Sequence, residues 1–240
     1  MQPFIGVHKL GFEGCLPWIH NEEGSGDRYY NSSVYYPDSM SKPRTKTGVT
    51  LDPGVDLGNS SPKLCKEVIG YFASQGELSS KQIVALKNAI DLKKEDAIAW
   101  MKFYIHLFKG KFNTPDEMDY FVMENYTAAP YWKPLKEHIP SIVSIKPLAV
   151  RKAIHTALLS NSYNRGSVAT INLAKEFVEK EEYQGLARAI RGIKHTIQSL
   201  RDRRDREALL IESAIIRNKF EEEFLSLNPR PFEIIREISL

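Results

Sequence analysis

The sequence predicts an α+β protein in which a small mixed region precedes a larger helical one. The first part of the chain is rich in Gly, Pro, Ser and Tyr, and it carries turn signals such as Gly24-Ser25-Gly26-Asp27 and Tyr36-Pro37-Asp38-Ser39. From Pro62 onward, apolar residues recur at helical spacing behind helix-start signals. We therefore expect an N-terminal lobe over residues 1–62 and a helical lobe over residues 63–240, which together form one domain.

In the N-terminal region we expect one short helix near residues 5–13, followed by short strands and loops. The helical region carries more explicit signals. Ser79-Ser80-Lys81-Gln82 is typical of a capping box, and Thr114-Pro115-Asp116-Glu117 predicts a second one with Pro at the first helical position. Further amphipathic segments predict helices at about 147–159, 168–179, 182–193 and from about 199 to beyond 215.

The composition narrows the function classes. Among 240 residues the formal net charge is only +3, which does not favour nucleic acid, although it would not oppose docking on an anionic polymer. The six histidines show no metal-binding spacing and Cys15 and Cys65 form no CxxC motif, so we expect no metal and no cofactor. Two unpaired thiols are the favoured reading of the cysteines, and a Cys15–Cys65 bridge is the alternative.

The start of the chain has no basic segment followed by a long apolar core, so we expect no signal peptide. No apolar run approaches the roughly 18 residues of a membrane span. We expect synthesis in a cytoplasm, with a separate route of delivery if the target lies outside it.

Three residues have the chemistry of glycosidic bond cleavage. Glu13 follows an apolar run, where partial burial of a carboxylic acid would suit it to donate a proton. Thr50 and Asp56 lie six positions apart in a glycine-punctuated β-type segment and would share a face with Asp52 and Gly54 if that segment were extended. Gly54 would then leave space for a sugar or a water, and two acids with a water-holding hydroxyl suit glycoside hydrolysis.

Each feature also has a plain structural reading. Glu13 could be a solvated helix-end residue, and Asp52-Pro53-Gly54 could be the polar turn of a hairpin. The run at 201–206 mixes Arg and Asp at spacings that neutralise each other on a helix, so we expect a solvated, salt-bridged helix start there. Several aromatic residues could stack on sugar rings or form a small core: Trp18, Tyr29, Tyr30, Tyr35 and Tyr36.

Four segments together resemble a known family. Glu13-Gly14, the Gly48–Gly58 element, Tyr163-Asn164-Arg165-Gly166 and the Leu200–Glu207 helix start occur in the order found in phage-type lysozymes. The chain is most similar to the pesticin-like bacterial toxin homologues of phage lysozyme, over roughly residues 5–215. The resemblance implies a lysozyme-like α+β fold, with the cleft residues in the N-terminal lobe and a C-terminal extension from about residue 216. It also implies that the run at 201–206 packs one lobe against the other.

The resemblance further implies a muramidase that cleaves the β-1,4 bond between N-acetylmuramic acid and N-acetylglucosamine in peptidoglycan. Glu13 would be the general acid, and Thr50 and Asp56 would position or activate water, which favours inversion at the anomeric carbon. Residues expected to contact substrate are Asp52, Gly54, Tyr163 and Asn164.

Such an enzyme would work without metal or cofactor, as a monomer, in the periplasm or cell wall of a target or host cell. An immunity or inhibitor protein is a possible partner, whereas nucleic acid and membrane insertion are not expected. Two departures from the family pattern, Asp52-Pro53 and the long insertion at about 21–44, keep an alternative open. That alternative is a catalytically inactive wall-binding or scaffold protein with the same fold.

Overall fold

We describe the protein from a computed structural model, which describes residues 5–23, 34–36, 47–112 and 114–227. Over these residues the chain is mostly helical and contains one small antiparallel sheet, so the prediction of an α+β protein is confirmed. Some predicted features lie outside the described residues. They are the turn signal at 24–27, the turn signal at 36–39 except for Tyr36, and most of the 21–44 insertion.

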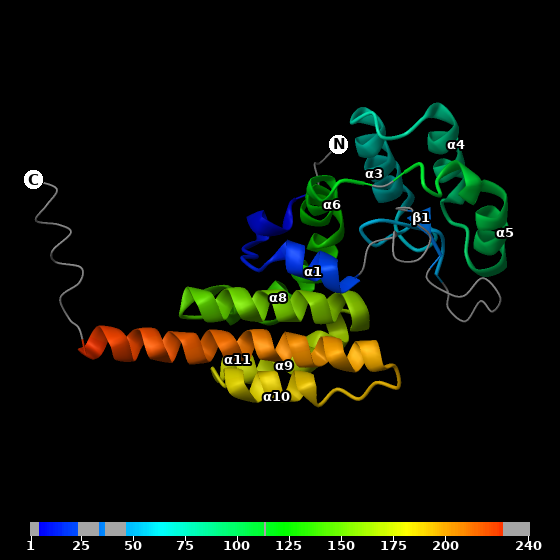
Figure 1. The fold of residues 1–240 in the computed structure, drawn as a ribbon. Helices are drawn as coiled ribbons and strands as arrows, with labels where there is room; N and C mark the ends of the chain where they lie inside the picture. The colour runs from blue at the N-terminus through cyan, green and yellow to red at the C-terminus, as the bar shows by residue number, and fades with distance from the viewer. Residues whose placement is uncertain (1–4, 24–33, 37–46, 113, 228–240) are drawn as a thin grey trace, which may run out of the picture. The chain divides into compact units, whose positions relative to one another are not determined.

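The chain divides into two compact units (Figure 1). The first comprises Met1–Leu10 and Leu16–Pro130, and the second comprises Gly11–Cys15 and Tyr131–Leu240. The boundary expected after residue 62 falls inside the first unit, because the helices that follow it share one hydrophobic core with the sheet. Burial of a common apolar core outweighs the change of composition that suggested the boundary.

The sheet of the first unit has the order β1-β2-β3 and is antiparallel throughout. Its strands pair in a register that sets Val34 opposite Leu51 and Leu51 opposite Val55, and all three side chains are fully buried. The elements of this unit are η1 (Val7–Leu10), α1 (Leu16–Glu23), β1 (Val34–Tyr35), β2 (Thr50–Leu51), β3 (Val55–Asp56), α3 (Pro62–Ser74), α4 (Ser80–Ala89), α5 (Lys94–Tyr104), η2 (Ile105–Leu107), α6 (Asp116–Val122) and the π-helical turn η3 (Met123–Thr127).

Two local predictions in this unit are wrong. The helix expected near residues 5–13 is only the short 3-10 turn η1, which ends where Gly11 adopts a φ of +83°. The second capping box does not form, because Pro115 is extended and occupies the N-cap position itself. The Thr114 side chain instead hydrogen-bonds to Asp119. By contrast, the capping box between Ser79 and Gln82 is confirmed.

The second unit is helical. Its last four helices pack against one another and lie side by side in Figure 1, which confirms the helices expected from about residue 147 onward. The final helix runs through Leu227, so the expected extension from about residue 216 continues it. The elements are α7 (Ala129–His138), η4 (Pro140–Ser144), α8 (Leu148–Arg165), α9 (Ser167–Glu179), α10 (Tyr183–Arg191) and α11 (Gln198–Leu227).

The Arg-rich start of α11 is not a wholly solvated surface, as the sequence suggested. Arg203, Arg204 and Glu207 are buried, and Glu207 lies 2.9 Å from Arg204 and 3.4 Å from Arg203. The hydroxyl of Ser160, on α8, donates to Glu207 over 2.5 Å. Buried charges require such partners, so one face of this helix start joins α8 to α11 inside the second unit.

Candidate functional site

Glu13 lies in the loop between η1 and α1, and its backbone is held by α8. The Glu13 N–H donates to Nδ1 of His155 over 3.0 Å, and the Cys15 N–H donates to the Thr156 hydroxyl over 2.8 Å. Glu13 therefore does not end a helix, and two buried side chains of α8 fix the loop that carries it. Its own side chain is 40% exposed.

Gly14 explains why the loop can approach α8 so closely. A Cβ atom at this position would lie 2.7 Å from the Thr156 backbone nitrogen and 2.5 Å from the Phe12 ring. Phe12 is itself buried and packs against His155 and Trp132. Only glycine fits this contact, so packing requires the glycine of the Glu-Gly pair.

Arg151 holds the carboxylate of Glu13. Its Nε lies 2.7 Å from Oε2, and its Nη1 donates to the carbonyls of Val143 and Ile145 over 3.2 and 3.4 Å. The guanidinium is thus anchored on η4 and the residue that follows it, which gives the carboxylate a defined orientation.

His155 is neutral in this arrangement. Its Nε2 lies 2.9 Å from the Ile142 carbonyl and its Nδ1 accepts from Glu13, and the tautomer with hydrogen on Nε2 satisfies both contacts. Burial lowers the pKa of His155 to about 4, because the charged form would be desolvated. Protonation of Nδ1 would also set two donors against each other.

Thr50 and Asp56 come together through strand pairing. The segment is a hairpin with Asp52-Pro53-Gly54 at its turn, and Thr50 of β2 lies directly opposite Asp56 of β3. Directly opposed residues point to the same face of a sheet, so these two share a face although the segment is not extended throughout. The hairpin alternative is the one observed, and Gly54 supports it with a φ of +82°. Thr50 is only 4% exposed.

The Asp56 carboxylate organises the loops around the hairpin. Its Oδ1 accepts from the backbone N–H groups of Gly48, Gly58 and Asn59 at 2.9, 2.9 and 3.2 Å, and its Oδ2 accepts from Asn59 Nδ2 at 2.7 Å. A carboxylate has about four lone-pair sites, and Oδ1 is saturated. Of the two oxygens, Oδ2 is the one with capacity to hold a water.

Glycines 48 and 58 meet at the base of the same hairpin. A Cβ on Gly48 would lie 2.5 Å from the Gly58 nitrogen, and one on Gly58 would lie 2.4 Å from the Leu92 carbonyl. The glycine punctuation of this element therefore allows close backbone approach. It lets three N–H groups converge on one carboxylate oxygen.

Asp52 belongs to a different cluster from Thr50 and Asp56. It is 2% exposed and lies with His20 of α1 and Asp119 of α6, which are 4% and 2% exposed. One ligand-type atom from each lies within 4.8 Å of the other two, and His20 Nε2 is 3.2 Å from Asp119 Oδ2. Burial raises the pKa of Asp119. Burial alone would lower the pKa of His20, but the hydrogen bond to Asp119 and the nearby carboxylate charges together outweigh it and raise that pKa. These are nitrogen and oxygen donors of the kind that bind divalent metal ions.

Tyr163 and Asn164, the other residues predicted to contact substrate, lie in the second unit. Tyr163 stacks on Tyr131 with ring centroids 4.6 Å apart, and Asn164 is exposed beside it near the end of α8. Tyr163 is eight residues beyond His155, which is about 12 Å along the helix. Tyr29 and Tyr30 fall outside the described residues, and Cys15 and Cys65 are both free.

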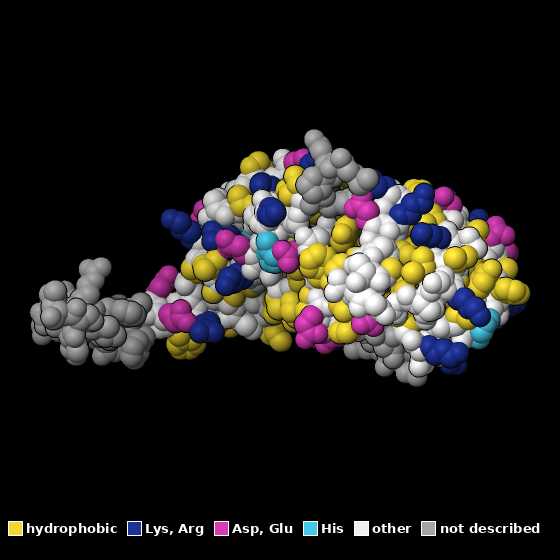
Figure 2. Space-filling view, turned by 90° about the horizontal axis from the view of Figure 1, so that it is seen from above, with side chains coloured by type: hydrophobic (Ala, Val, Ile, Leu, Met, Phe, Trp, Pro, Cys, Tyr) yellow, Lys and Arg dark blue, Asp and Glu magenta, His cyan; other side chains and the backbone are white. Residues whose placement is uncertain are grey.

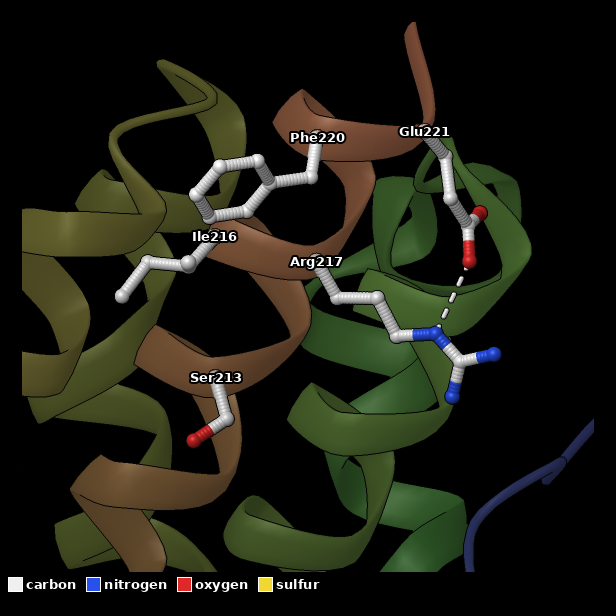
Figure 3. A pocket seen from close by; sticks show the side chains of 5 residues that line it. All are labelled: Ser213, Ile216, Arg217, Phe220 and Glu221. Atoms are coloured by element: carbon white, nitrogen blue, oxygen red, sulfur yellow. Dashed lines mark hydrogen bonds and ion pairs between the residues drawn. The ribbon is translucent and has the colours of Figure 1, made fainter. Parts of the chain in front are cut away.

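A separate hollow lies on the last part of α11 (Figure 3). It is lined by Ser213, Ile216, Arg217, Phe220 and Glu221, and Arg217 pairs with Glu221 at 2.8 Å. The two apolar side chains are exposed and the ion pair is local to one helix, so the hollow holds no catalytic arrangement. On the face drawn in Figure 2, basic and acidic side chains are interspersed.

The sequence predicted Glu13, Thr50 and Asp56 as site residues but did not indicate the residues that hold the Glu13 loop. The supporting side chains lie within one and a half turns of α8: Arg151, His155 and Thr156. The available signal in the sequence was a histidine four positions after an arginine in an apolar helical segment. Glu13 belongs to the second unit, whereas Thr50 and Asp56 belong to the first.

No protein-family model and no curated protein matches the chain. Among the described residues, no helix combines the length and the apolar character needed to cross a bilayer.

Proposed function

We propose that this protein is a peptidoglycan hydrolase of the lysozyme-like kind, cleaving the β-1,4 bond between N-acetylmuramic acid and N-acetylglucosamine. The observation that carries the proposal is the anchoring of Glu13. Two buried side chains of α8 fix its backbone while its carboxylate stays accessible and is oriented by Arg151. General acid catalysis needs a carboxyl group positioned within reach of the glycosidic oxygen, and this anchoring supplies the positioning.

The hairpin supplies the second half of the proposal. Thr50 and Asp56 share a face, and the Asp56 Oδ2 atom retains capacity to hold a water. In this mechanism Glu13 protonates the leaving oxygen, and a water held by Thr50 and Asp56 attacks the anomeric carbon, which gives inversion. The water loses its proton to Asp56 as the bond to carbon forms.

The family resemblance and the α+β architecture support a lysozyme-like fold as part of the same proposal. We extend it to a monomeric enzyme that acts on the wall of a target or host cell without a cofactor in the chemical step, and that an immunity or inhibitor protein could control. Tyr163 and Asn164, on the unit that carries Glu13, are the proposed secondary contacts with the glycan.

A second candidate is an inactive wall-binding or scaffold protein. The saturated Oδ1 of Asp56 and the burial of Thr50 favour it, since both fit a purely structural hairpin. This candidate retains peptidoglycan binding but predicts no release of reducing ends.

Digestion of purified peptidoglycan separates the two candidates. We expect the wild type to release fragments with N-acetylmuramic acid at the new reducing end, identified by mass spectrometry. Glu13→Gln should lose about 10²–10⁴-fold in rate, because the amide cannot donate the proton. The matched control is Glu137→Gln, an exposed glutamate on α7, which should leave the rate unchanged. An inactive wild type, or a Glu13→Gln variant with more than a tenth of its rate, would contradict the proposal.

A further inference from the structure

We propose that His20, Asp52 and Asp119 form a binding site for a divalent transition-metal ion of the Zn²⁺ type. The three residues come from three separate segments of the first unit: α1, the β2–β3 turn and α6. Each contributes one ligand-type atom, and all three side chains are more than nine-tenths buried. The site is distinct from the proposed hydrolytic residues and does not depend on hydrolysis.

The distances fit a small metal ion. Tetrahedral zinc with bonds of about 2.0 Å places its ligand atoms about 3.3 Å apart. His20 Nε2 and Asp119 Oδ2 are 3.2 Å apart, and every pair in the cluster is within 4.8 Å. Any pair wider than about 3.3 Å would have to close by side-chain adjustment on metal binding.

The donor types select the class of ion. One imidazole nitrogen and two carboxylate oxygens suit Zn²⁺ and the neighbouring first-row divalent ions. Ca²⁺ and Mg²⁺ prefer sites made of oxygen alone, so the histidine disfavours them. Three protein ligands leave a fourth position for a water.

The charge of the surroundings favours a cation. The carboxylates of Asp52 and Asp119 each place an oxygen within 4.8 Å of a ring nitrogen of His20. Two buried carboxylates beside one imidazole leave excess negative charge in the interior if both are ionised, and burial of unbalanced charge is unfavourable. A divalent ion balances both carboxylates at once.

The consequence is structural. Asp52 directly follows Leu51 in β2, so an ion bound here would tie the hairpin turn to α1 and α6. The same turn separates Thr50 from Asp56. Metal binding would thus stabilise the segment that carries these two residues, without contacting them.

The competing arrangement is a His20–Asp119 ion pair with Asp52 buried nearby and no metal. Titration of the chelator-treated full chain with Co²⁺, followed by displacement with Zn²⁺, distinguishes the two. We expect one Co²⁺ per chain with the intense visible absorption of four-coordinate cobalt, loss of that absorption on adding Zn²⁺, and a rise in melting temperature that saturates at one equivalent. The absence of saturable binding would overturn the proposal.

Substitutions locate the ion. Asp52→Asn and His20→Gln should weaken Zn²⁺ binding at least 100-fold, whereas Asp116→Asn, an exposed neighbour on α6, should change it less than threefold. Equal affinity in all three variants would place the ion elsewhere and reject the site.

A variant that gains an absorption band tests the site even if the other substitutions prevent folding. Asp52→Cys replaces a carboxylate by a thiolate of similar reach, so it retains three ligands and should add a thiolate-to-cobalt charge-transfer band that the wild type lacks, although the wild type contains Cys15 and Cys65. Absence of the band from a variant that binds Co²⁺ would overturn the assignment of Asp52.

Discussion

The Glu13 loop and the β2–β3 hairpin are held in opposite ways. At Glu13, buried side chains of α8 hold a backbone segment, and the carboxylate is left accessible. At the hairpin, the Asp56 carboxylate itself holds the backbone by accepting three N–H groups on one oxygen. The Glu13 carboxylate is therefore accessible and does not hold the fold together, whereas the Asp56 carboxylate is one of the groups that hold the hairpin together.

This difference separates stability from activity. Removing the charge of Glu13 should leave the protein folded, because the hydrogen bonds that hold this loop are made by backbone N–H groups and not by the Glu13 carboxylate. Removing the charge of Asp56 should weaken the hairpin and any chemistry there together. Loss of activity in an Asp56 variant is therefore weaker evidence for a catalytic role than the same loss in a Glu13 variant.

The largest effect on stability is expected for Gly14→Ala. The new Cβ would collide with the Thr156 backbone, which is part of α8, and with the buried Phe12 ring. Overpacking of this kind costs about 3 kcal/mol, and urea denaturation would measure it. Gly70→Ala is the control, since this exposed glycine of α3 has open space around it and should gain up to about 1 kcal/mol. Equal stability of the two variants would contradict the packing of the Glu13 loop.

The next effect is a pH dependence that comes from His155. Its pKa is about 4 in the folded protein and about 6.5 in the unfolded chain. The unfolded chain therefore binds the extra proton between these values, and stability is full above pH 6.5 and falls as the pH approaches 4. The shift corresponds to at most about 3 kcal/mol.

His155→Gln isolates this contribution from that of the other titrating groups. Denaturation of the variant and the wild type at a series of pH values should give curves that converge as the pH falls from about 6.5 to 4. A constant difference between the two curves would mean that His155 is not buried in its neutral form.

A smaller effect on stability tests the comparison directly. Asp56→Asn should lower the free energy of unfolding by about 2 kcal/mol, because hydrogen bonds to a charged acceptor become bonds to a neutral one. Glu13→Gln should lower it by less than about 1 kcal/mol, since its ion pair is partly solvent-exposed. Chemical denaturation of both variants at pH 7 would measure the difference. If Glu13→Gln were the more destabilised, the Glu13 carboxylate and not the Asp56 carboxylate would be the one that stabilises the fold.

The sequence indicated those features of the fold that depend on interactions between residues close together in the chain. The capping box at Ser79, the helices from about residue 147 onward and the turn at Asp52-Pro53-Gly54 all rest on contacts within a few residues. Alternation suggested the right partners, Thr50 and Asp56, for an incomplete reason. They share a face because they are paired across a hairpin, and the intervening Asp52 is directed into another cluster.

Long-range contacts could not be predicted in the same way. The partners of Glu13 lie about 140 positions away on α8, and His20, Asp52 and Asp119 meet only through tertiary packing. The boundary after residue 62 also failed to appear, because composition does not report which elements share a core. Spacing rules miss any site assembled from distant segments, and the absence of metal-binding spacing is therefore compatible with the proposed metal site.

The smallest effect on stability is expected for Thr50→Val, which asks whether the hairpin has a chemical role besides its structural one. Valine preserves the β-branched shape of this buried strand residue and removes only its hydroxyl, so the free energy of unfolding should change by less than about 1 kcal/mol. If that hydroxyl holds the attacking water with Asp56, the rate of peptidoglycan hydrolysis should fall about tenfold, which corresponds to about 1.4 kcal/mol of barrier. Thr50→Ser retains the hydroxyl and loses the methyl group, so it should be the less stable variant and the more active one. Rates from released reducing ends and stabilities from urea denaturation, measured on the same preparations, give the two rankings. Opposite rankings for rate and stability would separate the chemical role of Thr50 from its packing, whereas a rate that follows stability in both variants would leave Thr50 a purely structural residue.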